Sequence, residues 1–166
     1  MKVMVAVASK YGATFEIAES IGGVLRERGF EVDVAAIDRV SDLNAYDSVV
    51  AGSAVYAGHW LKVAKEFLEA NAESLRALPT WLFSSGPIGD PPKPEEDPVD
   101  AAPLVEISAA REHHVFGGKL DKSRLKFGEK ALVIALRAPE GDFRDWDEIS
   151  SWASGIADAL EAGPRP

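Results

Sequence analysis

The residues best suited to binding chemistry lie in one short segment, residues 9–14, which reads Ser-Lys-Tyr-Gly-Ala-Thr. This segment separates an apolar run, residues 3–8, from a stretch in which apolar residues recur with helical spacing. At the start of a helix the backbone N–H groups have no intrahelical partner and the helix dipole is positive, so an anion binds there readily. The hydroxyls of Ser9 and Thr14 add donors, and Gly12 permits a close approach or a positive φ. The segment therefore suits one terminal phosphate, although an ordinary capped turn uses the same residue types.

Other nucleotide and catalytic motifs are missing from the sequence. It has no G-x-x-x-x-G-K-[ST] run for a nucleoside triphosphate, and the single glycine of residues 9–14 does not make a G-x-G-x-x-G motif. None of Ser53, Ser84 and Ser85 stands in a G-x-S-x-G turn. His113 and His114 are adjacent, and adjacent residues on a strand point to opposite faces. We predict no metal site and assign no catalytic side chain.

The composition indicates a globular protein rather than a disordered or membrane-spanning one. The chain has 166 residues, of which 46% are hydrophobic and 27% charged, and its formal net charge is -9. An acidic surface repels phosphate backbones, so nucleic acid is not an expected partner. With no cysteine, no secretory signal and no apolar run of roughly 18 residues, we expect one cytoplasmic domain over residues 1–166.

Strand and helix patterns alternate along the chain. Strands are expected over residues 2–8, 31–37, 47–53, 80–84 and 113–116, and helices over residues 14–28, 59–75, 100–111 and 143–160. This alternation predicts a three-layer, doubly wound α/β fold with a five-stranded parallel sheet in the order 2-1-3-4-5. In that order ligands bind at the carboxyl ends of the first and third strands. The site is therefore expected in the loops at residues 9–14, 53–60 and 84–89.

Three segments carry a resemblance to a known superfamily. Residues 3–14 resemble the flavodoxin signature, a hydrophobic strand followed by [ST]-x-x-G-x-T. Residues 47–60, which contain G-x-x-x-x-x-G-H before a helix, resemble one branch of it, the menaquinone-dependent protoporphyrinogen dehydrogenases. So do residues 116–121, Phe-Gly-Gly-Lys-Leu-Asp, followed later by Asp145 and Trp146. The chain is identified as flavodoxin-like and as similar to that branch.

The resemblance implies that FMN is the cofactor and that all three loops hold it. Its 5′-phosphate would be held by Ser9, Lys10, Tyr11, Gly12, Ala13 and Thr14. Its ring would contact the second and third loops at Ser53, Val55, Tyr56, Ala57, Gly58, Ser84, Ser85, Gly86 and Gly89. Tyr56 offers an aromatic face, and the N–H groups of Ala57 and Gly58 suit the edge of the ring. For Trp60 core packing and flavin contact are both open, whereas His59 is expected to be a solvated cap.

The third loop bears on the choice between an enzyme and a carrier. Electron-carrier flavodoxins usually place a second aromatic residue there, and residues 84–89 contain none. An accessible flavin favours an FMN-dependent oxidoreductase similar to protoporphyrinogen dehydrogenases, with a quinone-type acceptor, unless Trp146 or Phe127 covers the ring. The alternative is a one-electron carrier between redox proteins. The expected partners are thus a redox protein, a quinone or a small-molecule substrate.

Residues 119–138 form an unusual segment. Five basic and two acidic residues between Lys119 and Lys130 precede six apolar residues, 131–136. Read as a helix, the segment would suit a membrane surface or a quinone-bearing partner. We favour the other interpretation, a split fifth strand or a buried helix with solvated lysines. Protoporphyrinogen dehydrogenases have a longer insertion at about this position, so the resemblance leaves the specific substrate open.

Overall fold

A parallel sheet with the predicted order forms the centre of the molecule. The computed structural model describes residues 1–86, 97–121, 123, 125–135 and 140–163. The five parallel strands are β1 (Lys2–Ala8), β2 (Glu31–Ala36), β3 (Ser48–Tyr56), β5 (Thr80–Ser85) and β6 (Glu112–Phe116). They lie in the order β2-β1-β3-β5-β6, which is 2-1-3-4-5 when the short strand β4 is set aside. The predicted doubly wound order is confirmed.

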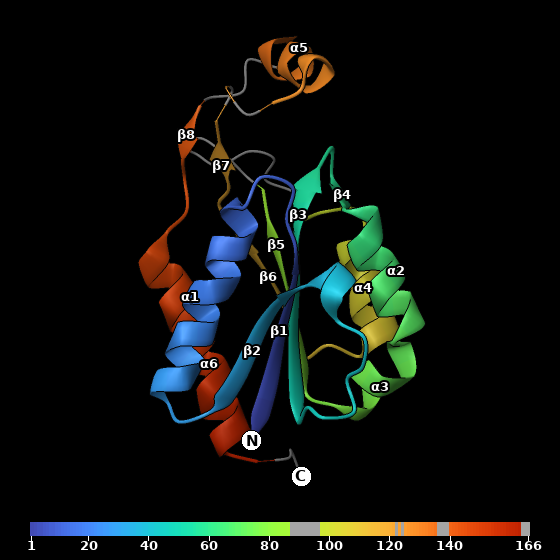
Figure 1. Ribbon diagram of the computed structural model, residues 1–166, viewed down its shortest axis with the longest axis vertical. Helices are drawn as coiled ribbons and strands as arrows, with labels where there is room; N and C mark the ends of the chain where they lie inside the picture. The colour runs from blue at the N-terminus through green and yellow to red at the C-terminus, as the bar shows by residue number, and fades with distance from the viewer. Residues whose placement is uncertain (87–96, 122, 124, 136–139, 164–166) are drawn as a thin grey trace.

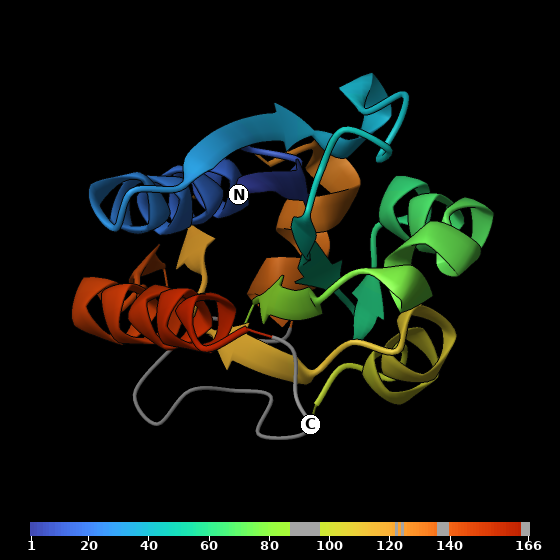
Figure 2. The same ribbon diagram turned by 90° about the horizontal axis from the view of Figure 1, so that it is seen from below.

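Helices cover both faces of this sheet (Figures 1 and 2). On one side lie α1 (Ala13–Glu27) and α6 (Trp146–Glu161), and on the other α2 (Lys62–Ala70), α3 (Ala72–Ala77) and α4 (Ala101–Ser108). The sequence of strand β1 is continuously apolar because its alternate residues pack into two hydrophobic cores, one on each face of the sheet. Val3, Val5 and Val7 pack with the α1 and α6 side, whereas Met4, Ala6 and Ala8 pack with the α2 side.

The predicted helix over residues 59–75 is wrong at its start and interrupted in its middle. Residues His59–Trp60 form strand β4, which pairs antiparallel with the end of β3. The turn between them is Ala57 and Gly58, both with positive φ, and two such residues make the tight hairpin turn that matches strand twist. The helical part then divides into α2 and α3 at Asn71, whose side-chain amide donates to the Phe67 carbonyl oxygen at 2.9 Å. A 3₁₀ turn, Ile37–Arg39, follows β2.

An excursion between β6 and α6 carries the remaining elements. It contains β7 (Lys119–Leu120) and β8 (Gly141–Asp142), which pair antiparallel, and α5 (Phe127–Ala135) between them. The expectation of a split strand is wrong for residues 131–135, which are helical. Nor is α5 a buried helix, because Phe127 is 89% and Ile134 64% exposed. Figure 1 places α5 beyond the carboxyl ends of the parallel strands, the end at which ligands bind in this topology.

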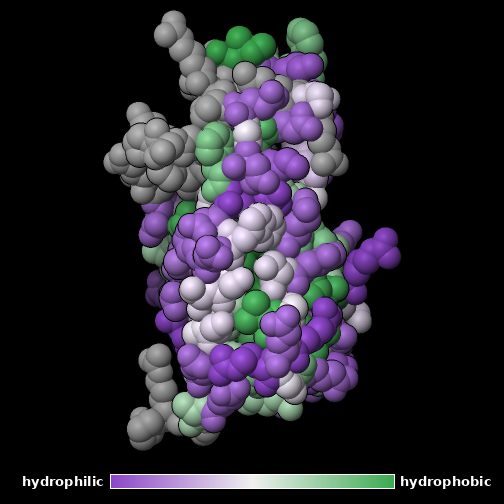
Figure 3. Space-filling model, turned by 90° about the vertical axis from the view of Figure 1, so that its left-hand side faces the viewer, coloured by the Kyte–Doolittle hydropathy of each residue, from purple (hydrophilic) through white to green (hydrophobic). Residues whose placement is uncertain are grey.

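Figure 3 shows a mostly hydrophilic face over α1 and α6, with hydrophobic patches in the lower half of this view and at the end of the molecule where α5 lies. Within the described part of the chain, no helix combines the length and the apolar character needed to cross a membrane.

Candidate functional site

The first loop leaves the start of α1 open to an anion. Gly12 precedes the helix with φ 90 and ψ -15, and no side chain among the described residues caps the helix N–H groups. The Ser9 Oγ accepts from the Gly12 N–H at 3.0 Å, so the loop is closed on itself one residue before the helix. Thr14 is buried in the first turn. Free N–H groups at a helix N-terminus fit a phosphate, and glycine adopts the positive φ of this loop without strain.

The side chains of the same loop turn toward α5. Lys10 Nζ lies 2.8 Å from Glu129 Oε2, and the Tyr11 hydroxyl donates to Glu129 Oε1 at 2.5 Å. These two bonds lower the pKa of the Glu129 carboxyl to about 2, and the bond to Glu129 raises the pKa of Lys10. The sequence did not indicate this contact, because Glu129 lies 119 positions after Lys10.

The second loop places an aromatic residue, Tyr56, beside the first loop. Tyr56 is 38% exposed, and Lys10 Nζ lies 5.5 Å from the centre of its ring, within the range of a cation–π contact. Desolvation of the hydroxyl, followed by the proximity of Tyr11 and Glu129, raises the pKa of Tyr56 to about 12. A small pocket of about 60 Å³ lies here, lined by Tyr11, Ala13, Glu16, Tyr56, Lys119, Leu120, Asp121 and Leu125. The loop at residues 9–14, the β3–β4 hairpin and the excursion therefore meet at one place.

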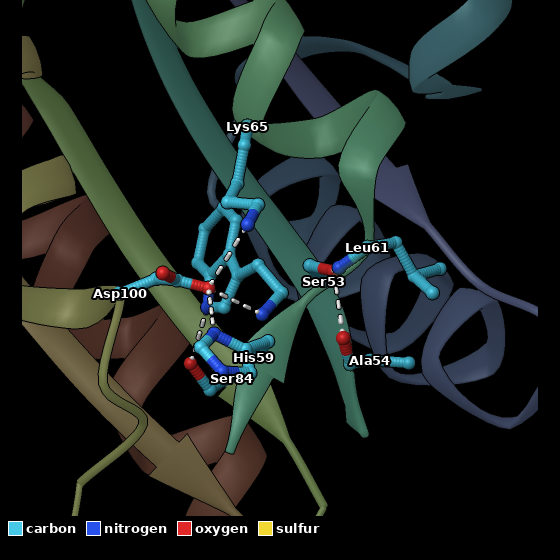
Figure 4. Close-up of polar contacts among 8 residues, drawn as sticks. Ser53, Ala54, His59, Leu61, Lys65, Ser84 and Asp100 are labelled. Carbon is cyan, nitrogen blue, oxygen red and sulfur yellow. Dashed lines mark hydrogen bonds and ion pairs between the residues drawn. The ribbon is translucent and has the colours of Figure 1, made fainter. Parts of the chain in front are cut away.

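Trp60 belongs to the core, which resolves its two interpretations in favour of packing. It is 2% exposed, and its indole Nε1 donates to Ser84 Oγ at 2.8 Å. Its backbone N–H donates to Asp100 Oδ2 at 3.0 Å, and Lys65 Nζ lies 3.5 Å from the same oxygen. Figure 4 shows Lys65, His59 and Asp100 converging here. These contacts fix the second strand of the hairpin against the sheet.

His59 is a surface residue, as predicted, but it does not cap a helix. Its Nδ1 lies 3.2 Å from Asp100 Oδ2, and the residue preceding α2 is Leu61. The Leu61 N–H in turn donates to Ser53 Oγ at 3.0 Å, and that hydroxyl donates to the Ala54 carbonyl oxygen (Figure 4). The Ser53 hydroxyl is therefore occupied by protein partners.

The third loop begins with two buried serines. The Ser84 hydroxyl bonds both Trp60 and His113, whose Nε2 lies 2.7 Å away, and burial lowers the pKa of that imidazole. With their hydroxyls occupied, Ser53 and Ser84 have only backbone groups to offer a ligand. The Gly86 N–H donates to the Phe116 carbonyl oxygen at 3.2 Å. Gly89, the last predicted contact of this loop, lies outside the described residues.

The two aromatic residues considered as flavin covers lie in different parts of the chain, one in the middle of the excursion and one at its C-terminal end. Phe127 begins α5 and is exposed, whereas Trp146 begins α6 and stacks on Arg144 with 4.6 Å between guanidinium carbon and ring centre. Arg144 also donates to the Ala13 carbonyl oxygen at 3.1 Å and lies 3.4 Å from a Glu16 carboxylate oxygen. Sequence reasoning missed this arginine. Among the residues that the structure describes, no group of three or more acidic or histidine side chains is placed to hold a metal.

Comparison with known proteins decides the family. A family model described as flavodoxin domain matches residues 4–147. The chain belongs to the flavodoxin domain family. FMN is therefore the cofactor of this flavodoxin-domain protein, as its sequence predicted.

Both a curated protein and solved structures are similar to this flavodoxin-domain chain. Protoporphyrinogen IX dehydrogenase (quinone) from Escherichia coli K12 is 26% identical over 172 residues, covering 95% of both chains. Among solved structures, an archaeal flavodoxin superposes with a TM-score of 0.65 at 19% identity, covering 97% of this chain and 99% of that one. Flavodoxin 1 from Bacillus cereus gives a TM-score of 0.64 at 17% identity, covering 95% and 98%. The structural likenesses establish the fold alone.

Proposed function

We propose that this flavodoxin-domain oxidoreductase oxidises a porphyrinogen and passes the electrons to a quinone. The single observation that carries the proposal is the match to protoporphyrinogen IX dehydrogenase (quinone) over 95% of both chains. Its 26% identity exceeds the 19% and 17% of the flavodoxins named above, which cover a similar share of this chain. The exposed face of Tyr56 and the absence of an aromatic residue from positions 84–89 also favour an accessible flavin.

The first loop is the proposed phosphate site. The N–H groups at the start of α1 and the hydroxyls of Ser9 and Thr14 would hold the phosphate, with Gly12 providing the required turn. Lys10 adds a cation within the same loop, and a cation close to a phosphate strengthens its binding. The support is the uncapped helix together with a loop shape that only glycine adopts readily.

The β3–β4 hairpin and the end of β5 form the proposed ring site. Tyr56 would present its aromatic face, and the backbone of Ala57, Gly58, Ser85 and Gly86 would contact the ring edge. Bound FMN supplies the ability to accept and return two electrons, which side chains lack. Each two-electron oxidation removes two electrons and two protons from the porphyrinogen, and the quinone accepts them as a quinol. The protein's own part is to hold the cofactor and leave one side of it open.

The test is a porphyrinogen oxidation assay with the FMN-loaded protein. Under anaerobic conditions with protoporphyrinogen IX and a water-soluble menaquinone analogue, we expect fluorescent porphyrin to form only when protein and quinone are both present. Gly12→Val, which should lose FMN, serves as the inactive control. The substrate assignment is wrong if FMN-loaded protein forms no more porphyrin than the control. Efficient electron transfer to a redox protein in that case would support the carrier function.

A further inference from the structure

One carboxylate joins the phosphate loop to α5. Glu129 Oε2 accepts from Lys10, and Glu129 Oε1 accepts from both the Tyr11 hydroxyl and the Lys126 N–H, the last at 3.3 Å. Lys126 immediately precedes α5, and Glu129 is the third residue of that helix. A glutamate at this position that accepts the N–H of the residue before the helix makes one half of a capping box, the half that satisfies that N–H group. The same side chain therefore starts α5 and binds two residues of the loop.

The C-terminal end of the excursion is attached to the first turn of α1 through Arg144. Arg144 bonds Asp142 of β8 through Nε and a terminal nitrogen, at 2.8 and 2.7 Å. It also donates to the Ala13 carbonyl oxygen and lies near the Glu16 carboxylate, with only 4% of its side chain exposed. The middle of the excursion, at Glu129, and its C-terminal end, at Arg144, thus both contact residues 10–16, which contain most of the proposed phosphate site.

We propose that Glu129 is a positioning residue of the FMN site, which couples docking of α5 to cofactor binding. The inference rests on the proposed placement of the FMN phosphate in residues 9–14. A loop that contains a glycine with positive φ loses considerable backbone freedom when it is ordered. Docking of α5 through Lys10 and Tyr11 orders this loop before the phosphate arrives. Coupling of this kind is reciprocal, so bound FMN also holds α5 in place.

A charge-only account makes the opposite prediction. Glu129 is an anion close to the proposed site of another anion, so its removal would strengthen FMN binding if repulsion were its only effect. In the structure, however, Lys10 compensates the carboxylate at 2.8 Å. The sign of the change in FMN affinity therefore distinguishes positioning from simple repulsion.

The test is Glu129→Gln, which removes the charge and retains a residue that serves in a capping box. We expect FMN to dissociate from this variant at most about five-fold faster, because an exposed ion pair contributes little. In the wild type, FMN should slow trypsin cleavage after Lys126 and Lys130, and in the variant this protection should be lost. In a Lys10→Met background, Glu129→Gln should change the FMN release rate by less than about two-fold, because the two side chains act together.

The matched control is Glu161→Gln. Glu161 pairs with Arg28 at 2.8 Å, the same distance, at the end of α6 remote from the loop. We expect this variant to release FMN and to be cleaved by trypsin as the wild type is. Slower FMN release from Glu129→Gln, or unchanged release with unchanged protection, overturns the inference. Failure of the wild type to bind FMN would overturn both this inference and the proposed function.

Discussion

Replacing Gly12 by alanine separates backbone conformation from available space in the loop proposed to bind phosphate. Gly12 has φ 90, and no described atom lies within 4 Å of a Cβ added there. The substitution therefore introduces conformational strain without a clash. A left-handed conformation costs a residue with a side chain roughly 1–2 kcal/mol. The variant can relieve that strain by leaving the loop shape seen in the structure, which binding of the phosphate would require, so the strain should appear as lost FMN affinity.

The Kd for FMN should rise about 5- to 30-fold, which corresponds to the same 1–2 kcal/mol. Quenching of flavin fluorescence on titration with apoprotein measures it directly. Gly23→Ala is the matched control, because Gly23 lies within α1, has no described neighbour within 4 Å and is not in a positive-φ conformation. It should leave the FMN Kd unchanged and raise the free energy of unfolding by about 0.5–1 kcal/mol. Equal FMN affinity for Gly12→Ala and Gly23→Ala would refute the assignment of this loop.

Three further predictions concern the sheet and the excursion. Gly52→Ala should lower the free energy of unfolding by about 1–3 kcal/mol, because its Cβ would meet the Phe83 ring at 2.2 Å. Urea denaturation measures this, and an unchanged midpoint would contradict the packing. Ser84→Ala should lower the free energy of unfolding by about 1–3 kcal/mol, because it leaves the buried indole N–H of Trp60 without its acceptor. A variant as stable as the wild type in urea denaturation would contradict that bond. The bonds to Glu129 hold the pKa of its carboxyl at about 2, below its ordinary value of 4.5. Their contribution to docking of α5 is therefore complete above pH 4.5 and is lost as the pH falls toward 2. In that pH interval, amide hydrogen exchange in α5 should accelerate relative to exchange in α1, which corrects for the intrinsic pH dependence. If the ratio of the exchange rates in α5 and α1 stays constant, the contact is contradicted.

The sheet could be predicted because its strands carry their own signals. Residues 3–8 are apolar at every position since both faces of β1 are covered, and alternation with helices then restricts the strand order. The β3–β4 hairpin was missed for a local reason. Its turn places Ala57 at φ 51, and alanine does not indicate a positive φ as glycine or asparagine would.

The parts of the site that escaped prediction depend on contacts between distant residues. The bonds of Glu129 to Lys10 and of Arg144 to Ala13 span more than 100 residues, and no local pattern announces such pairs. Trp60 could not be assigned from sequence, because an indole suits either a core or a cofactor site. The structure assigns it to the core, where its indole N–H donates to the Ser84 hydroxyl. The individual contacts of the proposed FMN site remain predictions.

The central claim is that residues 9–14 hold the 5′-phosphate of FMN. Comparing the affinity of the apoprotein for FMN with its affinity for riboflavin tests this most directly, because the two molecules differ only in that phosphate. We predict that FMN binds with a Kd of about 1 μM or lower and that riboflavin binds at least about 100-fold more weakly, a difference of about 2.7 kcal/mol. Equal affinity for the two flavins, or no binding of either, would contradict the account.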